Sequence, residues 1–175
     1  MSKQIKSQDR VQKLGEVFTN EKEINAMLDL IKDKSYEINS TFLEPSCGNG
    51  NFLVKILERK LKTVRDKYAD NEIKYLAQSI LAITSIYGID IMQDNVEESI
   101  DRMYNIYKTY YQQCFHKNIP TKASNTIYQI LKLNIQQGNT LTGLKDDNTD
   151  IIINEWKLKD RHFEKQEFKF NELLK

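Results

Sequence analysis

The chain has 175 residues, of which 39% are hydrophobic, and its formal net charge is +1 at pH 7. This length suits one domain with a hydrophobic core, and the near-zero charge excludes a global basic field for nonspecific nucleic-acid binding. Cys47 and Cys114 lie far apart, so neither a disulfide framework nor a metal site is expected, and a reducing, cytoplasmic location follows. The polar N-terminus and short apolar runs predict neither a signal peptide nor a membrane span.

The first 40 residues are expected to be helical. Residues 1–14 are polar and basic, which indicates either a frayed helical arm or an arm that contacts nucleic acid. From Ile24 to Ile31 the apolar residues fall on one helical face. Thr19 or Asn20 can cap this helix.

Residues 41–54, TFLEPSCGNGNFLV, predict a short strand, a tight loop with two glycines and the start of an amphipathic helix. Such a turn presents free N–H groups and a positive helix end to a ligand. A dinucleotide loop would need a small residue where Leu53 stands, and a triphosphate loop would need Gly-Lys-Ser/Thr, which the chain lacks. Glu44 would repel phosphate but suits a cofactor with a cationic amino-acid end, such as S-adenosylmethionine. The alternative is a plain strand-to-helix turn.

A charged helix, a second helix over residues 71–83 and a strand over residues 85–91 follow. Two parallel strands joined by helices carry ligand sites at their carboxyl ends, so Asp90 is expected on the same rim as the glycine loop. Its carboxylate can accept hydrogen bonds from ribose hydroxyls, and Ile91 can pack on an adenine ring. Alternatively, Asp90 is only a strand-end or helix-cap acid; Asp94 is the better candidate for the next helix cap, which would free Asp90 for a ligand.

Helical spacing continues from Asn95 to Phe115 with many tyrosines, which favours core packing over stacking on nucleic acid. Another apolar helix precedes residues 135–141, IQQGNTL, where Asn139 either belongs to a simple turn or contacts a ligand. A strand is expected over residues 150–153, and residues 165–175 predict one strand and a short helix. His116 and His162 are isolated in the sequence and are expected at the surface.

Residues 44–53, EPSCGNGNFL, resemble the cofactor motif of adenine-N6 DNA methyltransferases of restriction-modification systems, E/D-P-x-C/A-G-x-G-x-F-L. Residues 15–19, GEVFT, resemble the other cofactor motif of that family, G-E-x-F-T-P, placed ahead of the glycine loop. Two motifs in the right order are more specific than either alone. The resemblance implies a Rossmann-like, S-adenosylmethionine-dependent methyltransferase three-layer α/β fold, minimal or truncated, with N-terminal helices. It also implies that the cofactor contacts Phe18, Thr19, Glu44, Cys47, Gly48, Gly50, Phe52, Asp90, Ile91 and Asn139.

The resemblance breaks at the catalytic motif. The family carries D/N/S-P-P-Y/F after the next strand, whereas this chain reads Asn154-Glu155-Trp156 without either proline. In the family, the first side chain and the following carbonyl accept hydrogen bonds from the target amine, and the aromatic ring stacks on the flipped base. By this match, Asn154 and Trp156 are the candidate catalytic residues.

These patterns together predict one domain over residues 1–175. It comprises a helical part (1–40), the cofactor-binding half of the sheet (41–154) and a short extension (155–175). The leading functional hypothesis is a DNA adenine-N6 methyltransferase domain or fragment with DNA as its partner and a second protein chain as a candidate to complete it. The rival hypothesis is a noncatalytic relative that binds cofactor, DNA or protein in regulation or assembly.

Overall fold

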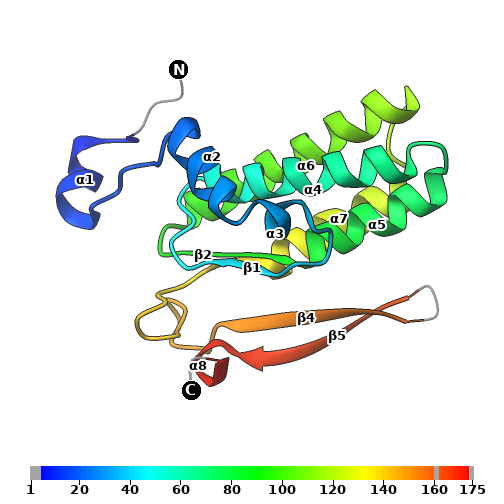
Figure 1. The fold of residues 1–175 in the computed structure, drawn as a ribbon. Helices are drawn as coiled ribbons and strands as arrows, with labels where there is room; N and C mark the ends of the chain where they lie inside the picture. Colours follow the sequence, from blue (N-terminus) through cyan, green and yellow to red (C-terminus); the bar gives the residue numbers. More distant parts are fainter. Residues whose placement is uncertain (1–4, 160–161, 174–175) are drawn as a thin grey trace.

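The structure is a computed structural model and describes residues 5–159 and 162–173. Three parallel strands, β1 (Phe42–Glu44), β2 (Ile86–Asp90) and β3 (Ile135–Gln137), form a sheet in the order β1-β2-β3. Phe42 pairs with Ile86, and Asp90 pairs with Gln137. Helices connect the strands, so the protein is mixed α/β, as the sequence predicted (Figure 1).

Four helices pack on one another over one side of this sheet (Figure 1): α4 (Asn51–Tyr68), α5 (Glu72–Thr84), α6 (Gln93–Phe115) and α7 (Thr121–Asn134). Asn71 caps α5, because its side chain accepts a hydrogen bond from the Lys74 N–H. Tyr107 and Tyr111 of α6 are fully buried, and the Tyr107 hydroxyl lies 2.8 Å from Ser79 Oγ. The tyrosine-rich stripe therefore packs in the core, as predicted.

The central strand β2 is buried along its whole length and serves two clusters. Ile86 belongs to the main core under the helices, whereas Tyr87 and Ile89 pack against Ile151, Ile153 and Phe170. Gly88 faces α4: a Cβ added there would lie 2.7 Å from a Leu53 methyl carbon. The absence of a side chain at this position lets the start of α4 approach the sheet closely.

The C-terminal part forms an antiparallel hairpin of β4 (Ile152–Lys159) and β5 (His162–Lys169), followed by α8 (Phe170–Leu173). The expected strand and short helix near the C-terminus are present. However, the strand expected over residues 150–153 does not extend the parallel sheet; it begins β4, which pairs with β5. Two consecutive strands can pair in parallel only when a long crossover connects them. Only residues 160–161 separate β4 from β5, so these two strands form an antiparallel hairpin.

Three helices precede the sheet: α1 (Gln8–Leu14), α2 (Glu21–Leu30) and α3 (Lys32–Tyr36). Of the two candidate caps for α2, Asn20 makes the bond, because its side chain accepts from the Glu23 N–H at 3.0 Å. Helix α1 stands apart from the helical layer (Figure 1) and is tied to α6 by Arg10, whose Nη2 lies 2.8 Å from both carboxylate oxygens of Asp94.

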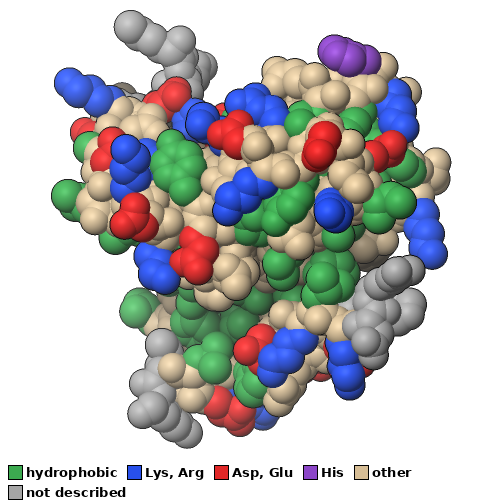
Figure 2. Space-filling view, turned by 45° about the vertical axis from the view of Figure 1, so that its right-hand side comes forward, with side chains coloured by type: hydrophobic (Ala, Val, Ile, Leu, Met, Phe, Trp, Pro, Cys, Tyr) green, Lys and Arg blue, Asp and Glu red, His purple; other side chains and the backbone are tan. Residues whose placement is uncertain are grey.

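Side chains of both charges are intermixed over the face shown in Figure 2, without a continuous basic area on that face. Among the helices within residues 5–159 and 162–173, none combines the length and the apolar character needed to cross a membrane.

Candidate functional site

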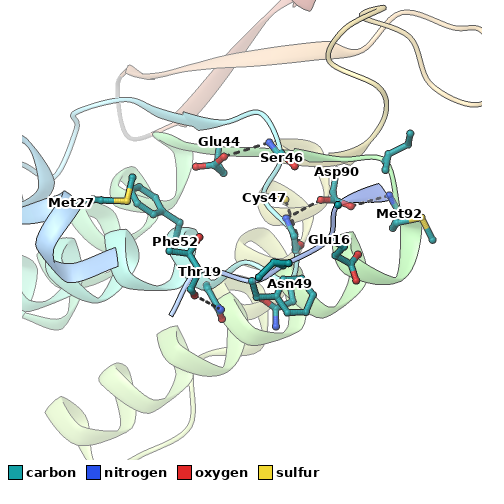
Figure 3. Close-up of a pocket in the computed structure, with 16 residues that line it drawn as sticks. Glu16, Thr19, Met27, Glu44, Ser46, Cys47, Asn49, Phe52, Asp90 and Met92 are labelled. Carbon is teal, nitrogen blue, oxygen red and sulfur yellow. Dashed lines mark hydrogen bonds between the residues drawn. The ribbon is translucent and has the colours of Figure 1, made fainter. Parts of the chain in front are cut away.

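A cavity of about 310 Å³ opens at the carboxyl ends of β1 and β2 (Figure 3). Its walls come from residues 15–19, Met27 of α2, the end of β1 with the glycine loop and the start of α4, and residues 90–92 after β2. The two stretches that resemble cofactor motifs thus face one space, although 24 residues separate Thr19 from Glu44 in the chain. All predicted cofactor residues except Gly50 and Asn139 line this cavity.

The glycine loop has the backbone that its sequence indicates. Gly48 and Gly50 have φ angles of +52° and +79°, a region that disfavours residues with a side chain. The Phe18 ring lies over Gly48, where an added Cβ would be 3.0 Å from a ring carbon. A Cβ at Gly50 would lie 2.8 Å from Ser99 Oγ, so Gly50 serves the contact between the loop and α6.

Asp90 holds the loop against the end of β2. The Gly48 N–H donates to Asp90 Oδ2 at 2.8 Å, while the Met92 N–H and Asn95 Nδ2 donate to Asp90 Oδ1 at 2.9 and 3.1 Å. A carboxylate offers about four acceptor positions, so capacity for a ligand hydroxyl remains. The expected capping role of Asp94 is wrong: Met92 occupies the N-cap position without a side-chain bond, and Asp94 instead pairs with Arg10.

Glu44 is a half-buried carboxylate at the end of β1, beside the glycine loop (Figure 3). Its one hydrogen bond comes from the Ser46 N–H at 3.4 Å, and no Lys or Arg among the described residues forms an ion pair with it. Burial raises the pKa of Glu44 above its usual range. A positively charged ligand group beside this carboxylate would therefore be stabilised.

Cys47 lines the same cavity as a buried thiol. Burial, and after it the negative charge of Asp90, raise the pKa of the Cys47 thiol to about 12. The thiol therefore stays protonated at neutral pH and is not an activated nucleophile.

Glu16 is a site residue that the sequence-based assignment omitted, although it stands in the GEVFT stretch. Its carboxylate lines the cavity and accepts hydrogen bonds from Asn95 Nδ2 at 2.8 Å and from Arg10 Nη1 at 3.4 Å. Since Asn95 Nδ2 also donates to Asp90, one amide links the GEVFT segment to the end of β2. Asn51 Nδ2 similarly donates to the Thr19 carbonyl at 3.0 Å, which joins that segment to α4.

Asn139 lies in the turn after β3. Its Oδ1 accepts a hydrogen bond from the Leu141 N–H at 2.9 Å, and its own N–H donates to the Leu144 carbonyl at 2.8 Å. This arrangement matches the simple-turn alternative. The neighbouring Thr140 hydroxyl donates to the Pro45 carbonyl at 3.2 Å and so ties the turn to the loop after β1.

The candidate catalytic residues are not brought to the cavity. Asn154 is 2% exposed, and its Nδ2 donates to the Leu133 carbonyl at 3.1 Å. The Trp156 Nε1–H donates to Asn134 Oδ1 at 2.8 Å. Leu133 and Asn134 directly precede β3, so both contacts lie at its amino end, whereas the cavity opens at the carboxyl ends of β1 and β2. Because β4 forms a hairpin with β5, it does not carry these side chains to that rim.

Comparisons of the chain with known protein families, with curated proteins and with solved structures gave no match. The fold and the site define a mixed α/β protein with a three-stranded parallel sheet and a cavity at the carboxyl ends of β1 and β2.

Proposed function

We propose that this cavity binds S-adenosylmethionine and that the chain is the cofactor-binding part of an adenine-N6 DNA methyltransferase, with a minimal or truncated Rossmann-like methyltransferase fold. The observation that carries the proposal is that Glu44 and the glycine loop line the same cavity. A half-buried carboxylate that has no ion-pair partner among the described residues favours a cationic ligand, while the loop glycines allow close approach to the backbone. S-adenosylmethionine carries both an ammonium and a sulfonium charge.

The two ends of the cavity suit the two ends of this cofactor. Glu44 and Ser46 lie on the β1 side, where the amino-acid end would be held. Ile91, which is 46% exposed, follows β2 and offers an apolar surface for an adenine ring. Asp90 lies beside it with acceptor capacity for a ribose hydroxyl. Any such bond would add to the three that Asp90 already accepts.

The position of Asn154 and Trp156 supports a second candidate function: cofactor binding without methyl transfer by this chain alone. Transfer to adenine requires an acceptor for the amine and a pocket for the flipped base next to the methyl donor. The Asn154 amide is buried and bonded to Leu133, and the Trp156 indole is bonded to Asn134. Under this reading, a partner chain supplies the catalytic part, or the chain acts in regulation or assembly.

Titration calorimetry tests cofactor binding, which both candidate functions require. The parent protein should bind S-adenosylmethionine and its demethylated product, and Glu44→Gln should weaken binding by about tenfold, the scale of one hydrogen-bonded ionic contact. Glu172→Gln on α8, outside the cavity, is the matched control and should bind like the parent. Absence of binding by the parent protein, or equal binding by Glu44→Gln, would reject the assignment of this cavity.

A further inference from the structure

The outer edge of β5 has backbone groups that make no hydrogen bond to any residue the structure describes. The Phe170 N–H donates to the Ile151 carbonyl at 2.9 Å, which extends the β4–β5 ladder by one hydrogen-bonded pair. Hydrogen-bonded and non-hydrogen-bonded pairs alternate in an antiparallel ladder, so the even-numbered residues of β5 face β4. The N–H and C=O groups of Phe163, Lys165, Glu167 and Lys169 therefore point away from the hairpin.

The two edges of the hairpin differ in whether their outward backbone groups are hydrogen-bonded to the rest of the protein. On β4, the Ile152 and Asn154 carbonyls accept hydrogen bonds from Gln136 Nε2 and from the Tyr87 hydroxyl, at 2.5 and 2.7 Å. Strand β5 lies on the far side of β4 from the parallel sheet (Figure 1), and no hydrogen bond joins its outward backbone groups to another described residue. A two-stranded hairpin is marginally stable alone, and an open edge is a template for another strand.

The charges along this edge are self-complementary, which favours a second copy of the chain as its occupant. We infer that β5 pairs antiparallel with β5 of a second copy of the chain, in the register centred on Gln166. In that register Lys165 faces Glu167 of the second copy, and Glu167 faces its Lys165. The neighbouring registers that also join outward-facing groups are centred on Lys165 or on Glu167, and each places like charges directly opposite, which is unfavourable.

The paired edges would form a four-stranded antiparallel sheet with a twofold axis at Gln166. Such an interface is self-complementary, as twofold dimers require. Within one copy, Lys165 Nζ already lies 2.5 Å from Glu167 Oε1. In the dimer the four charges would alternate around the axis, so each side chain gains a second partner of opposite charge. This inference stands independently of the proposed cofactor.

Sedimentation equilibrium of the full chain, from micromolar to millimolar concentration, tests the dimer. The parent should show a monomer–dimer equilibrium. Lys165→Glu and Glu167→Lys should each weaken dimerisation by about tenfold or more, because two attractive cross-strand pairs become repulsive. The double variant Lys165→Glu/Glu167→Lys should restore it. Lys108→Glu on α6 changes the net charge by the same amount as Lys165→Glu does and should leave the equilibrium unchanged.

Amide hydrogen exchange keeps the test independent of variant folding. In the parent, exchange at Lys165 and Glu167 should slow as concentration rises, because their amides become paired in the dimer. A parent that stays monomeric over this range would overturn the inference. So would a dimer that survives either single charge reversal, a folded double variant that stays monomeric, or concentration-dependent protection confined to residues outside β5.

Discussion

The carboxylate of Asp90 accepts a hydrogen bond from the backbone N–H of Gly48 at 2.8 Å, across 42 positions in the sequence. Asp90 is 6% exposed, and its other oxygen accepts from Met92 and Asn95. The end of β2 therefore fixes the glycine loop, so the shape of the cavity depends on the integrity of this contact.

We predict that Asp90→Ala lowers the free energy of unfolding by about 1–3 kcal/mol, because it leaves the partly buried N–H donors of Gly48 and Met92 without this partner. It should also weaken binding of S-adenosylmethionine. Urea unfolding followed by circular dichroism measures the first effect and calorimetry the second. Asp146→Ala, at an exposed position, is the control. Parent-like stability and binding in Asp90→Ala would contradict the role assigned to this carboxylate.

Gly48→Ala should impair ligand binding more than Gly15→Ala does. Both glycines have a positive φ, +52° and +65°, so each substitution carries a similar backbone strain of about 1–2 kcal/mol. A Cβ at Gly48 additionally lies 3.0 Å from the Phe18 ring, whereas a Cβ at Gly15 meets nothing within 4 Å. Thermal stabilisation by S-adenosylmethionine should be lost in the first variant and kept in the second. Equal loss in both variants would mean that strain, and not the Phe18 contact, controls the site.

Binding of S-adenosylmethionine should weaken as the pH falls into the acidic range. Burial raises the pKa of Glu44 in the free protein, so this group takes up a proton at a higher pH than an exposed glutamate would. Protonation removes the negative charge that attracts the cationic ligand. Calorimetry on the parent and on Glu44→Gln, which cannot titrate, measures the effect as the difference between two pH profiles. Parallel profiles would exclude Glu44 as the responsible group.

Lys60 should make the protein more stable as the pH rises from 7 to about 9. Its side chain is 0% exposed, and burial lowers the pKa of its amine to about 7. Between this value and the unfolded pKa, the unfolded chain binds the proton and the folded chain does not. The free energy of unfolding therefore increases with pH in this window.

Above pH 9 the Cys47 thiol makes the free energy of unfolding decrease as the pH rises. The pKa of this thiol is raised to about 12 in the folded chain, which therefore keeps a proton that the unfolded chain loses. Urea unfolding at several pH values between 7 and 9 measures the slope, and Lys60→Met should reduce it. The carbonyls of Ile38 and Ser40 accept hydrogen bonds from Lys60, so this variant should also be less stable at every pH. A slope equal to that of the parent would assign the effect to another group.

The isolated chain should produce no more than background N6-methyladenine when incubated with labelled S-adenosylmethionine and varied DNA. The reason is the burial of Asn154 and the bond from Trp156 to Asn134, away from the cavity. Rescue of activity by a lysate of the source organism would indicate a split enzyme. Multiple-turnover methylation by the pure chain would contradict the prediction and would require β4 to rearrange.

The sequence by itself determined the local features of the site. A positive φ at Gly48 and Gly50, a cap for α2 at Thr19 or Asn20, of which the structure uses Asn20, and the strand that ends in Asp90 all depend on residues close in the chain. Turn conformation, capping and helical periodicity act over a few residues, so their signals can be recognised directly in the sequence.

Only the tertiary structure decided which strands pair and which polar groups meet. The spacing around Asn154 suits a strand, but it does not say whether that strand joins β1 or forms a hairpin with β5. Likewise, nothing near Asp90 in the sequence shows that its carboxylate binds the Gly48 N–H. Strand pairing and buried polar contacts join residues distant in the chain, and the packing of the whole molecule selects among partners that local preferences leave equivalent.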